Sequence, residues 1–199
     1  MIIKVAVTGG IGSGKTTALN LLKRAGYNCV SADEIYRGML KDEDFVVRLS
    51  EYMGISPSTE NGKRVLDKKR LSEIVFNDKK ELKKLDDYTH PLIMNVLTEQ
   101  LNELKSEIAF AEVPLLFEGG YGFLFDYVLI VKRDYERRVS GTIERDGKSR
   151  EEVERIISKQ CNEEFKTSDG KFFIIENNGT TGELFQALKV VVDKILEKP

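Results

Sequence analysis

The segment that most constrains this chain is a glycine-rich turn at residues 9–16, which reads Gly-Gly-Ile-Gly-Ser-Gly-Lys-Thr. It fits the pattern GxxxxGK[ST], with an apolar, β-branched run before it and a helical repeat of apolar residues after it. The glycines permit backbone angles that a Cβ would forbid, so successive N–H groups can converge on phosphate oxygens. We therefore predict nucleotide binding, against the alternative of a plain strand-to-helix turn. The motif alone does not separate a kinase from a GTPase, a motor or a switch.

Several features of this turn suit a nucleoside triphosphate. The positive end of the following helix dipole points at the phosphates, and Lys15 can reach the β and γ groups. The Thr16 hydroxyl is suited to ligate Mg²⁺, so Thr16 is the expected metal ligand. The ATP contacts expected within and just after the turn are Gly10, Gly12, Ser13, Gly14, Lys15, Thr16 and Thr17.

Five short apolar runs predict the strands of a parallel α/β sheet flanked by helices. They lie at residues 2–8, 28–32, 108–113, 127–131 and 172–176. Between the second and third runs the sequence changes to charged amphipathic helices, interrupted only by a polar loop at residues 55–63. Between the fourth and fifth runs lie two more charged helices, the second opened by a capping box from Ser149 to Glu152. The predicted domains are a nucleotide-binding core at 1–32, 107–133 and 171–199, a helical lobe at 33–106 and a lid at 134–170.

The composition argues against some partners and compartments. The formal net charge is −2 at pH 7, so there is no global basic field that would favour nucleic acid. No apolar stretch approaches membrane-spanning length, and the N-terminus lacks the pattern of a secretory signal. Cys29 and Cys161 form no metal-ligand pattern and are interpreted as buried or idle thiols. We expect a cytoplasmic protein with no nucleic-acid or membrane partner, and a monomer as the default state.

Asp33 is the candidate group on the acceptor side. It follows the second apolar run, at the sheet edge where open α/β sheets bind ligands, and it is suited to take a proton from an attacking hydroxyl. The alternative interpretation is a helix N-cap, and the two are compatible. Further along, arginines between residues 137 and 150 are suited to close over phosphates as a lid, with Arg145 the first candidate. A solvated helix surface is the alternative for that charged run.

Several short motifs follow one another in a fixed order along nearly the whole chain. They are residues 8–17 around the glycine-rich turn, Ala32-Asp33, His90-Pro91-Leu92, Val113 to Glu118, Arg145-Asp146, Gln160 and Asn177-Asn178-Gly179. In this order they resemble the dephospho-CoA kinase family, which carries out the last step of coenzyme A synthesis. The motifs His-Pro-Leu and Val-Pro-Leu-Leu-Phe-Glu are the specific ones, because the turn is shared by many ATPases.

The resemblance implies a P-loop kinase fold in which a five-stranded parallel sheet carries a helical substrate lobe and a lid. It implies transfer of the ATP γ-phosphate to the ribose 3′-hydroxyl of dephospho-CoA, with Mg²⁺. Asp33 falls on the family's catalytic base, and we expect it to orient the hydroxyl and take its proton late in the transfer. With Asp33, the expected catalytic residues are Lys15 and Arg145. The expected substrate-binding residues are Thr8, Asp33, His90, Pro114, Leu115, Glu118 and Arg138, and Asn177 is an expected ATP contact.

Some positions depart from the family pattern. Ser31 replaces the first aspartate of the usual Asp-Ala-Asp, and Gly141 stands where a lid arginine is common. Arg138, about one helical turn earlier, is the candidate substitute for that arginine.

Other positions keep two interpretations. His90, as the residue before a proline, either ends a helix or contacts substrate. Asn177 either contacts adenine or helps to form a turn. Glu112 stands where many P-loop proteins carry a metal-supporting acid, but the family does not require one there, so we expect no catalytic role for it.

Overall fold

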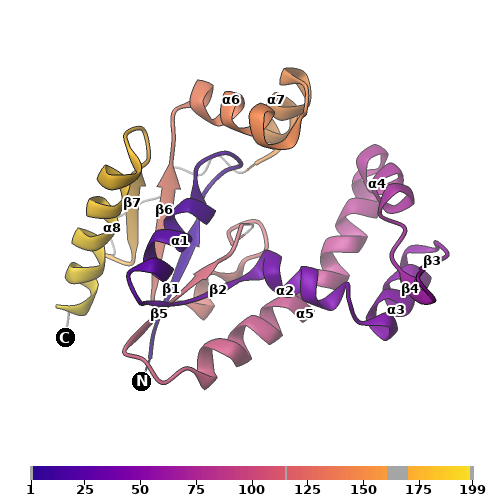
Figure 1. Ribbon diagram of the computed structural model, residues 1–199, viewed down its shortest axis with the longest axis horizontal. Helices are drawn as coiled ribbons and strands as arrows, with labels where there is room; N and C mark the ends of the chain where they lie inside the picture. Colours follow the sequence, from indigo (N-terminus) through magenta and orange to yellow (C-terminus); the bar gives the residue numbers. More distant parts are fainter. Residues whose placement is uncertain (1, 115, 161–169, 198–199) are drawn as a thin grey trace. The chain divides into compact units, whose positions relative to one another are not determined.

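The computed structural model describes residues 2–114, 116–160 and 170–197. These residues form two compact units. The first unit comprises the chain up to residue 30 and from residue 100 onward, and the second comprises residues 31–99. Figure 1 labels the elements of both.

A five-stranded sheet with the order β2-β5-β1-β6-β7 forms the centre of the first unit. Its strands are β1 Ile3–Thr8, β2 Asn28–Ser31, β5 Ile108–Glu112, β6 Tyr127–Lys132 and β7 Phe172–Glu176. β1 pairs in parallel with both β5 and β6, and β6 pairs in parallel with β7. The central strands are mostly apolar because both faces of the sheet are covered, and every residue of β5 is buried. The predicted five-stranded α/β fold is confirmed.

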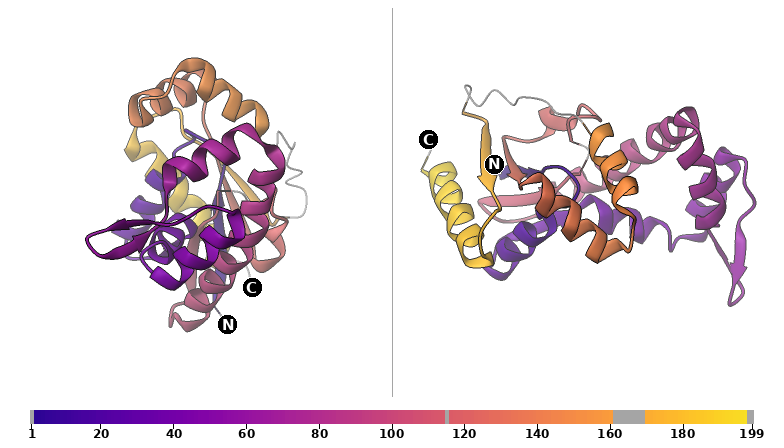
Figure 2. Two further views of the ribbon diagram at one scale, coloured as in Figure 1. Left: turned by 90° about the vertical axis from the view of Figure 1, so that its right-hand side faces the viewer. Right: turned by 90° about the horizontal axis from the view of Figure 1, so that it is seen from above.

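Two helices, α1 (Lys15–Arg24) and α8 (Thr181–Leu196), share one apolar core with the sheet. Figure 2 shows α8 running along the β7 side of the sheet. The largest fully buried side chains of this core are Leu22, Phe110, Leu129, Leu188 and Ile195. Burial of such side chains contributes most of the free energy that stabilises the layers, at about 1.5–3 kcal/mol each.

The same unit carries α6 (Tyr135–Asp146) and α7 (Arg150–Lys159), which pack against each other through Val139, Val153 and Ile157. The predicted capping box is confirmed, because the Ser149 hydroxyl accepts from the Glu152 backbone and the Glu152 carboxylate accepts from the Ser149 backbone. A short 3₁₀ helix, η1 (Tyr121–Leu124), lies between β5 and β6.

The second unit is built from helices around a separate apolar core. Its helices are α2 Ala32–Met39, α3 Glu43–Met53, α4 Lys68–Asn77 and α5 Lys79–Glu103, of which α5 continues into the first unit. The fully or nearly fully buried residues of its core are Phe45, Val46, Leu49, Met53, Leu66 and Leu71. Asp42 and Asp67 cap α3 and α4 by accepting backbone N–H bonds, which explains where these two helices begin.

The prediction of a polar loop at residues 55–63 is wrong in one respect, because most of these residues belong to a β-hairpin. Strands β3 (Ser58–Glu60) and β4 (Lys63–Val65) pair antiparallel around Asn61 and Gly62. Both turn residues have positive φ, at 51° and 79°, as a two-residue hairpin turn requires. The Asn-Gly pair is the sequence signal that predicts such a hairpin.

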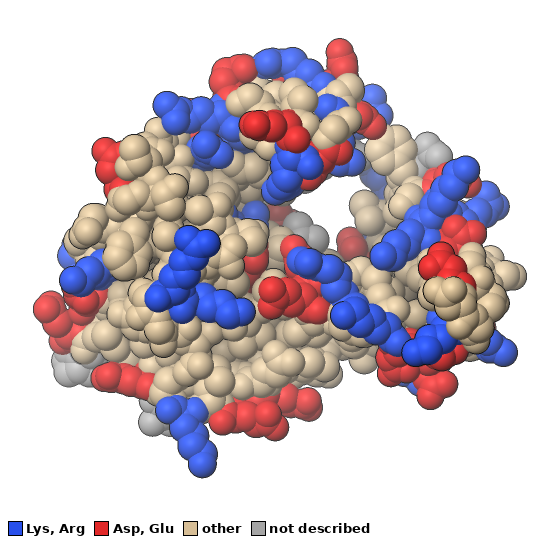
Figure 3. Space-filling model, in the orientation of Figure 1, with Lys and Arg blue, Asp and Glu red and all other residues tan. Residues whose placement is uncertain are grey.

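The helix-ending interpretation of His90 is also wrong, because α5 continues through Pro91. Proline removes one N–H from the helical ladder, but the 25-residue helix continues on both sides of Pro91. Of the residues described, no helix combines the length and the apolar character needed to cross a membrane. Figure 3 shows that Lys and Arg are interspersed with Asp and Glu on the visible face.

Candidate nucleotide site

The turn of residues 9–16, called the phosphate loop from here on, connects β1 to α1 at the carboxyl edge of the sheet. Gly9, Gly12 and Gly14 have φ values of 146°, 73° and 96°, in the region that side chains disfavour. A Cβ on Gly12 would come within 2.5 Å of the Arg138 carbonyl oxygen, and one on Gly9 would overlap the Val131 carbonyl. Both backbone angle and space therefore require glycine at these two positions.

The two polar side chains at the start of α1 are already engaged within the first unit. Lys15 Nζ donates to the carbonyl oxygens of Gly9 at 2.8 Å and of Gly10 at 3.0 Å. Thr16 Oγ1 donates to Glu112 Oε1 at 2.7 Å. Glu112 is only 3% exposed and ends β5, next to β1 in the sheet. The hydroxyl predicted to bind metal thus lies against a buried carboxylate.

Residue Ile11 is held from three directions by α6 and the end of α7. Its N–H donates to Gln160 Oε1 at 2.8 Å, and its carbonyl accepts from Arg138 Nε at 2.9 Å. Arg138 Nη2 also donates to Gln160 Oε1 at 3.2 Å. The Ile11 side chain packs against the core between α6 and α7. These contacts fix the first half of the phosphate loop.

Asn177 holds the second half of the loop. Its Nδ2 donates to the Ser13 carbonyl at 2.8 Å, and its backbone N–H donates to the Lys132 carbonyl at 2.8 Å. A Cβ on Gly14 would overlap the Asn177 amide, so this glycine is also required by space. Ser13 Oγ is buried and has no hydrogen-bond partner among the described residues. A bound phosphate oxygen is the kind of group that such a hydroxyl lacks.

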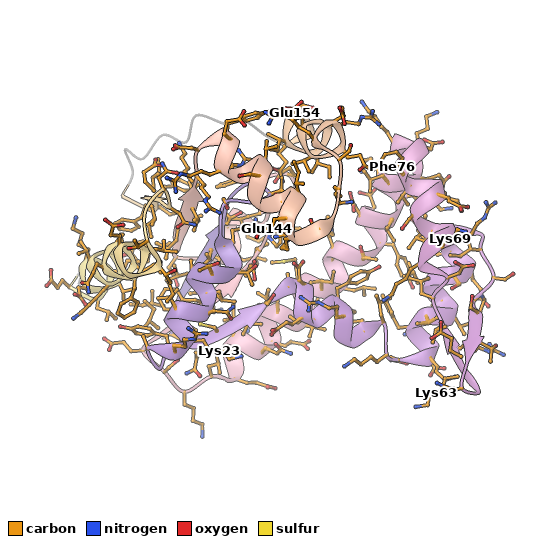
Figure 4. The ribbon with its side chains drawn as sticks, turned by 45° about the horizontal axis from the view of Figure 1, so that its top comes forward. Lys23, Lys63, Lys69, Phe76, Glu144 and Glu154 are labelled. Carbon is orange, nitrogen blue, oxygen red and sulfur yellow. The ribbon has the colours of Figure 1, made fainter. Side chains whose placement is uncertain are left out.

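The arginines of the predicted lid differ in their surroundings. Arg138 is partly buried, and burial lowers its pKa below the ordinary value. Arg145 lies on the surface in a bidentate pair with Asp146, with N–O distances of 2.6 and 2.8 Å. That hydrogen-bonded pair lowers the pKa of Asp146. Arg150 bonds Glu136 and Glu154, and Figure 4 labels Glu154 on α7 and Glu144 on α6.

The loop after β5 contains the other predicted residues of the first unit. Leu116 is fully buried and Phe117 packs against Phe172, so Leu116 belongs to the core of this unit. Pro114 is half-buried and Glu118 is exposed. Leu115 lies outside the described residues, as does Cys161. At the ends of β1 and in α1, Thr8 is buried and Thr17 is exposed.

Asp33 and His90 belong to the second unit, where each has a defined local setting. Asp33 is exposed in the first turn of α2 and is not the cap, because Ser31 Oγ accepts from the Glu34 N–H at 3.4 Å. The N-cap alternative for Asp33 is therefore wrong, and Ser31 is the capping residue.

His90 Nε2 lies 3.4 Å from Asp86 Oδ1 on the same helix. Burial raises the pKa of Asp86, while the neighbouring His90 acts in the opposite direction.

Within the first unit, then, the phosphate loop has partners from four elements distant in sequence, which are β5, α6 and the ends of α7 and β7. The residues brought together around it are Thr16 with Glu112, Ile11 with Arg138 and Gln160, and Ser13 with Asn177. The sequence motifs included Gln160 but gave it no role, and its pairing with Ile11 spans 149 residues. No local pattern predicts a contact over that separation.

Comparison with known proteins adds the family. A family model described as dephospho-CoA kinase matches residues 3–183. A dephospho-CoA kinase of Fusobacterium nucleatum is 33% identical over 188 residues, which cover 94% of this chain and 96% of that protein. A crystal structure of a Thermus thermophilus protein is similar with a TM-score of 0.77 and 34% identity, covering 98% of both chains. A Campylobacter jejuni dephospho-CoA kinase structure gives a TM-score of 0.68 and 29% identity, again with 98% of both chains covered.

Proposed function

The chain belongs to the dephospho-CoA kinase family, and we propose that it transfers the γ-phosphate of ATP to the ribose 3′-hydroxyl of dephospho-CoA. The products are coenzyme A and ADP. The observation that carries the proposal is the phosphate loop, in which Lys15 and the N-terminus of α1 meet within a frame held by Gln160 and Asn177. Such a loop supplies N–H groups and positive charge to a polyphosphate.

The reaction asks the protein mainly for positioning and for charge neutralisation. A bond forms between the ribose O3′ and the γ-phosphorus, and the bond from that phosphorus to the β,γ-bridging oxygen breaks. The bridging oxygen leaves with ADP. In our proposal Asp33 accepts the proton of the hydroxyl, and Lys15 neutralises charge on the phosphates. Asp33 is suited to this role because its carboxylate is exposed and is not used to cap α2.

ATP-dependent kinases work with a divalent metal, and we propose Mg²⁺ held through Thr16. The described residues contain no cluster of three or more His, Cys, Asp or Glu side chains that could bind a metal by themselves. That suits Mg²⁺, which keeps several waters and binds through one or two protein groups and the substrate phosphates. The hard oxygen donors of Thr16 and Glu112 fit such an ion. When bound, the ion offsets negative charge on the phosphate oxygens. Glu112 acts as a positioning residue, because accepting the Thr16 hydrogen orients that hydroxyl.

The remaining site residues complete the proposal. Arg145 closes over the phosphates as part of a lid at residues 134–170, and residues 33–106 receive the acceptor. The acceptor contacts proposed in this way are Thr8, His90, Pro114, Leu115, Glu118 and Arg138, and Asn177 contacts the nucleotide. Arg145 must then exchange its Asp146 partner for phosphate oxygens when ligands bind. A monomeric state and a cytoplasmic location stay predictions, which sedimentation and fractionation would test.

The function is tested by ADP release from the full chain with ATP and Mg²⁺, with and without dephospho-CoA. A panel with nucleoside monophosphates and other metabolite hydroxyls examines acceptor choice. We expect release to require dephospho-CoA and to fall about 10²–10⁴-fold in Asp33→Asn, the usual effect of losing a general base. Glu34→Gln, in the same exposed turn, is the matched control and should keep activity. Full activity of Asp33→Asn would remove Asp33 from the mechanism, and release that ignores dephospho-CoA would overturn the proposed function.

A further inference from the structure

Arg133 is a residue that neither the motifs nor the proposed mechanism uses. It follows β6 directly and lies partly buried in the link between β6 and α6 (Figure 1). Its Nε is fully buried and has no hydrogen-bond partner among the described residues. A buried donor that stays unpaired is costly, and buried guanidinium groups normally have acceptors. Among the described residues, Arg133 thus keeps a donor without an acceptor.

Gly141 explains how the Arg133 side chain is accommodated. Arg133 Nη1 lies 3.5 Å from the position that a Cβ on Gly141 would take. Glycine in the middle of a helix such as α6 is unfavourable compared with alanine, so its presence needs a packing reason. A residue without a side chain leaves room for the flat guanidinium beside the helix backbone. Larger side chains at position 141 would compete for that space.

The position of Arg133 relative to the phosphate loop follows from strand pairing. β6 pairs with β1, and Val131, two residues before Arg133, has its carbonyl against Gly9. Lys132, the preceding residue, accepts the backbone N–H of Asn177, whose side chain holds Ser13. Arg133 thus leaves the sheet at the loop, on the side of β6 and β7.

The two sides of the loop differ in chemistry. On the β5 side, the carboxylate of Glu112 lies against Thr16, which suits a cation and the phosphoryl end of a nucleotide. On the β6 and β7 side, Arg133 and the Asn177 amide supply a flat cation and hydrogen-bonding groups. Guanidinium groups stack well on flat aromatic rings, and their N–H groups find acceptors in sugars and bases.

We propose that Arg133 binds the nucleoside part of the donor ATP, with its guanidinium stacked on the adenine base. The inference rests on the proposed function for the identity of the donor. Arg133 is a nucleotide-binding residue in this account and does not take part in the chemistry. It supports base recognition from β6, while the phosphate loop binds the triphosphate.

The test is equilibrium titration of the full chain with ATP and, separately, with inorganic tripolyphosphate, which lacks a base. Arg133→Met should weaken ATP binding about fivefold, from the size of a guanidinium–ring contact, and leave tripolyphosphate binding unchanged. Arg24→Met, an exposed arginine in the last turn of α1, removes the same charge and should alter neither affinity. Unchanged ATP affinity in Arg133→Met would overturn the proposal. Equal weakening of ATP and tripolyphosphate would overturn the placement of the base.

A second variant tests the proposal even if Arg133→Met fails to fold. Gly141→Leu keeps Arg133 but fills the space beside it, so it should also weaken ATP and spare tripolyphosphate. Steady-state kinetics with dephospho-CoA should show a raised KM for ATP and an unchanged kcat for Arg133→Met. If the wild-type chain makes no coenzyme A, the proposed function fails, while the titrations still decide whether Arg133 binds a nucleoside.

Discussion

Replacing Arg138 with methionine removes one hydrogen bond from α6 to the phosphate loop and one to Gln160, which also contacts that loop. The lost bonds are Nε to the Ile11 carbonyl at 2.9 Å and Nη2 to Gln160 Oε1 at 3.2 Å. Hydrogen bonds of a charged donor contribute about 1.5–3 kcal/mol each. Arg138 is only partly buried, and its lowered pKa shows that burying its charge opposes part of this gain. We therefore expect the free energy of unfolding to fall by about 2 kcal/mol in total.

The assay for this prediction is urea denaturation of the full chain, compared with Arg137→Met on the exposed side of the same helix. A double-mutant cycle with Gln160→Leu should show coupling of about 0.5–3 kcal/mol, because the two side chains contact each other and both hydrogen-bond the backbone of Ile11. The KM for ATP should rise as the loop loosens. Equal stability of Arg138→Met and Arg137→Met, or a cycle without coupling, would show that these hydrogen bonds do not stabilise the fold.

Three further predictions concern parts of the first unit away from the reaction. Burial raises the pKa of Cys29 to about 11. In a Cys161→Ser chain, the Cys29 thiol should therefore react only slowly with a disulfide reagent until the chain unfolds. Rapid labelling of the folded chain would contradict this prediction. Thr180→Ala should cost about 1 kcal/mol in urea denaturation, since Thr180 caps α8, and an unchanged midpoint would exclude the cap. Hydrogen bonds from Thr180 lower the pKa of Glu183. The difference in free energy of unfolding between wild type and Glu183→Gln should therefore be present above the ordinary carboxyl pKa, about 4.3, and should vanish as the pH falls through the lowered pKa of Glu183. A stability difference that does not depend on pH would contradict this prediction.

The sheet and the phosphate loop were predictable because their physical requirements are written locally in the sequence. Strands buried on both faces read as continuous apolar runs, and β5 and β6 are of this kind. The loop needs glycine where φ is positive and where a neighbouring backbone approaches, as at Gly9 and Gly12. Both signals lie within a few residues, so no knowledge of distant contacts is needed.

The missed features have different physical causes. The hairpin around Asn61-Gly62 has a local signal, but its strands are only three residues each and mostly exposed, so no apolar alternation marks them. The hydrogen bond between Gln160 and Ile11 joins residues that are 149 positions apart in the sequence. The hydrogen bond between Thr16 and Glu112 joins residues that are 96 positions apart. Only the folded arrangement of elements brings such pairs together, and the same holds for Arg133 beside Gly141.

The most direct test of the central claim is to identify the hydroxyl that receives the phosphate. The full chain would be incubated with ATP, Mg²⁺ and either dephospho-CoA or its 3′-deoxy and 2′-deoxy analogues, and products would be identified by mass spectrometry and phosphorus NMR. The account predicts one added phosphate on dephospho-CoA and on the 2′-deoxy analogue, and none on the 3′-deoxy analogue. Phosphorylation of the 3′-deoxy analogue, or ADP formation without a phosphorylated acceptor, would contradict it.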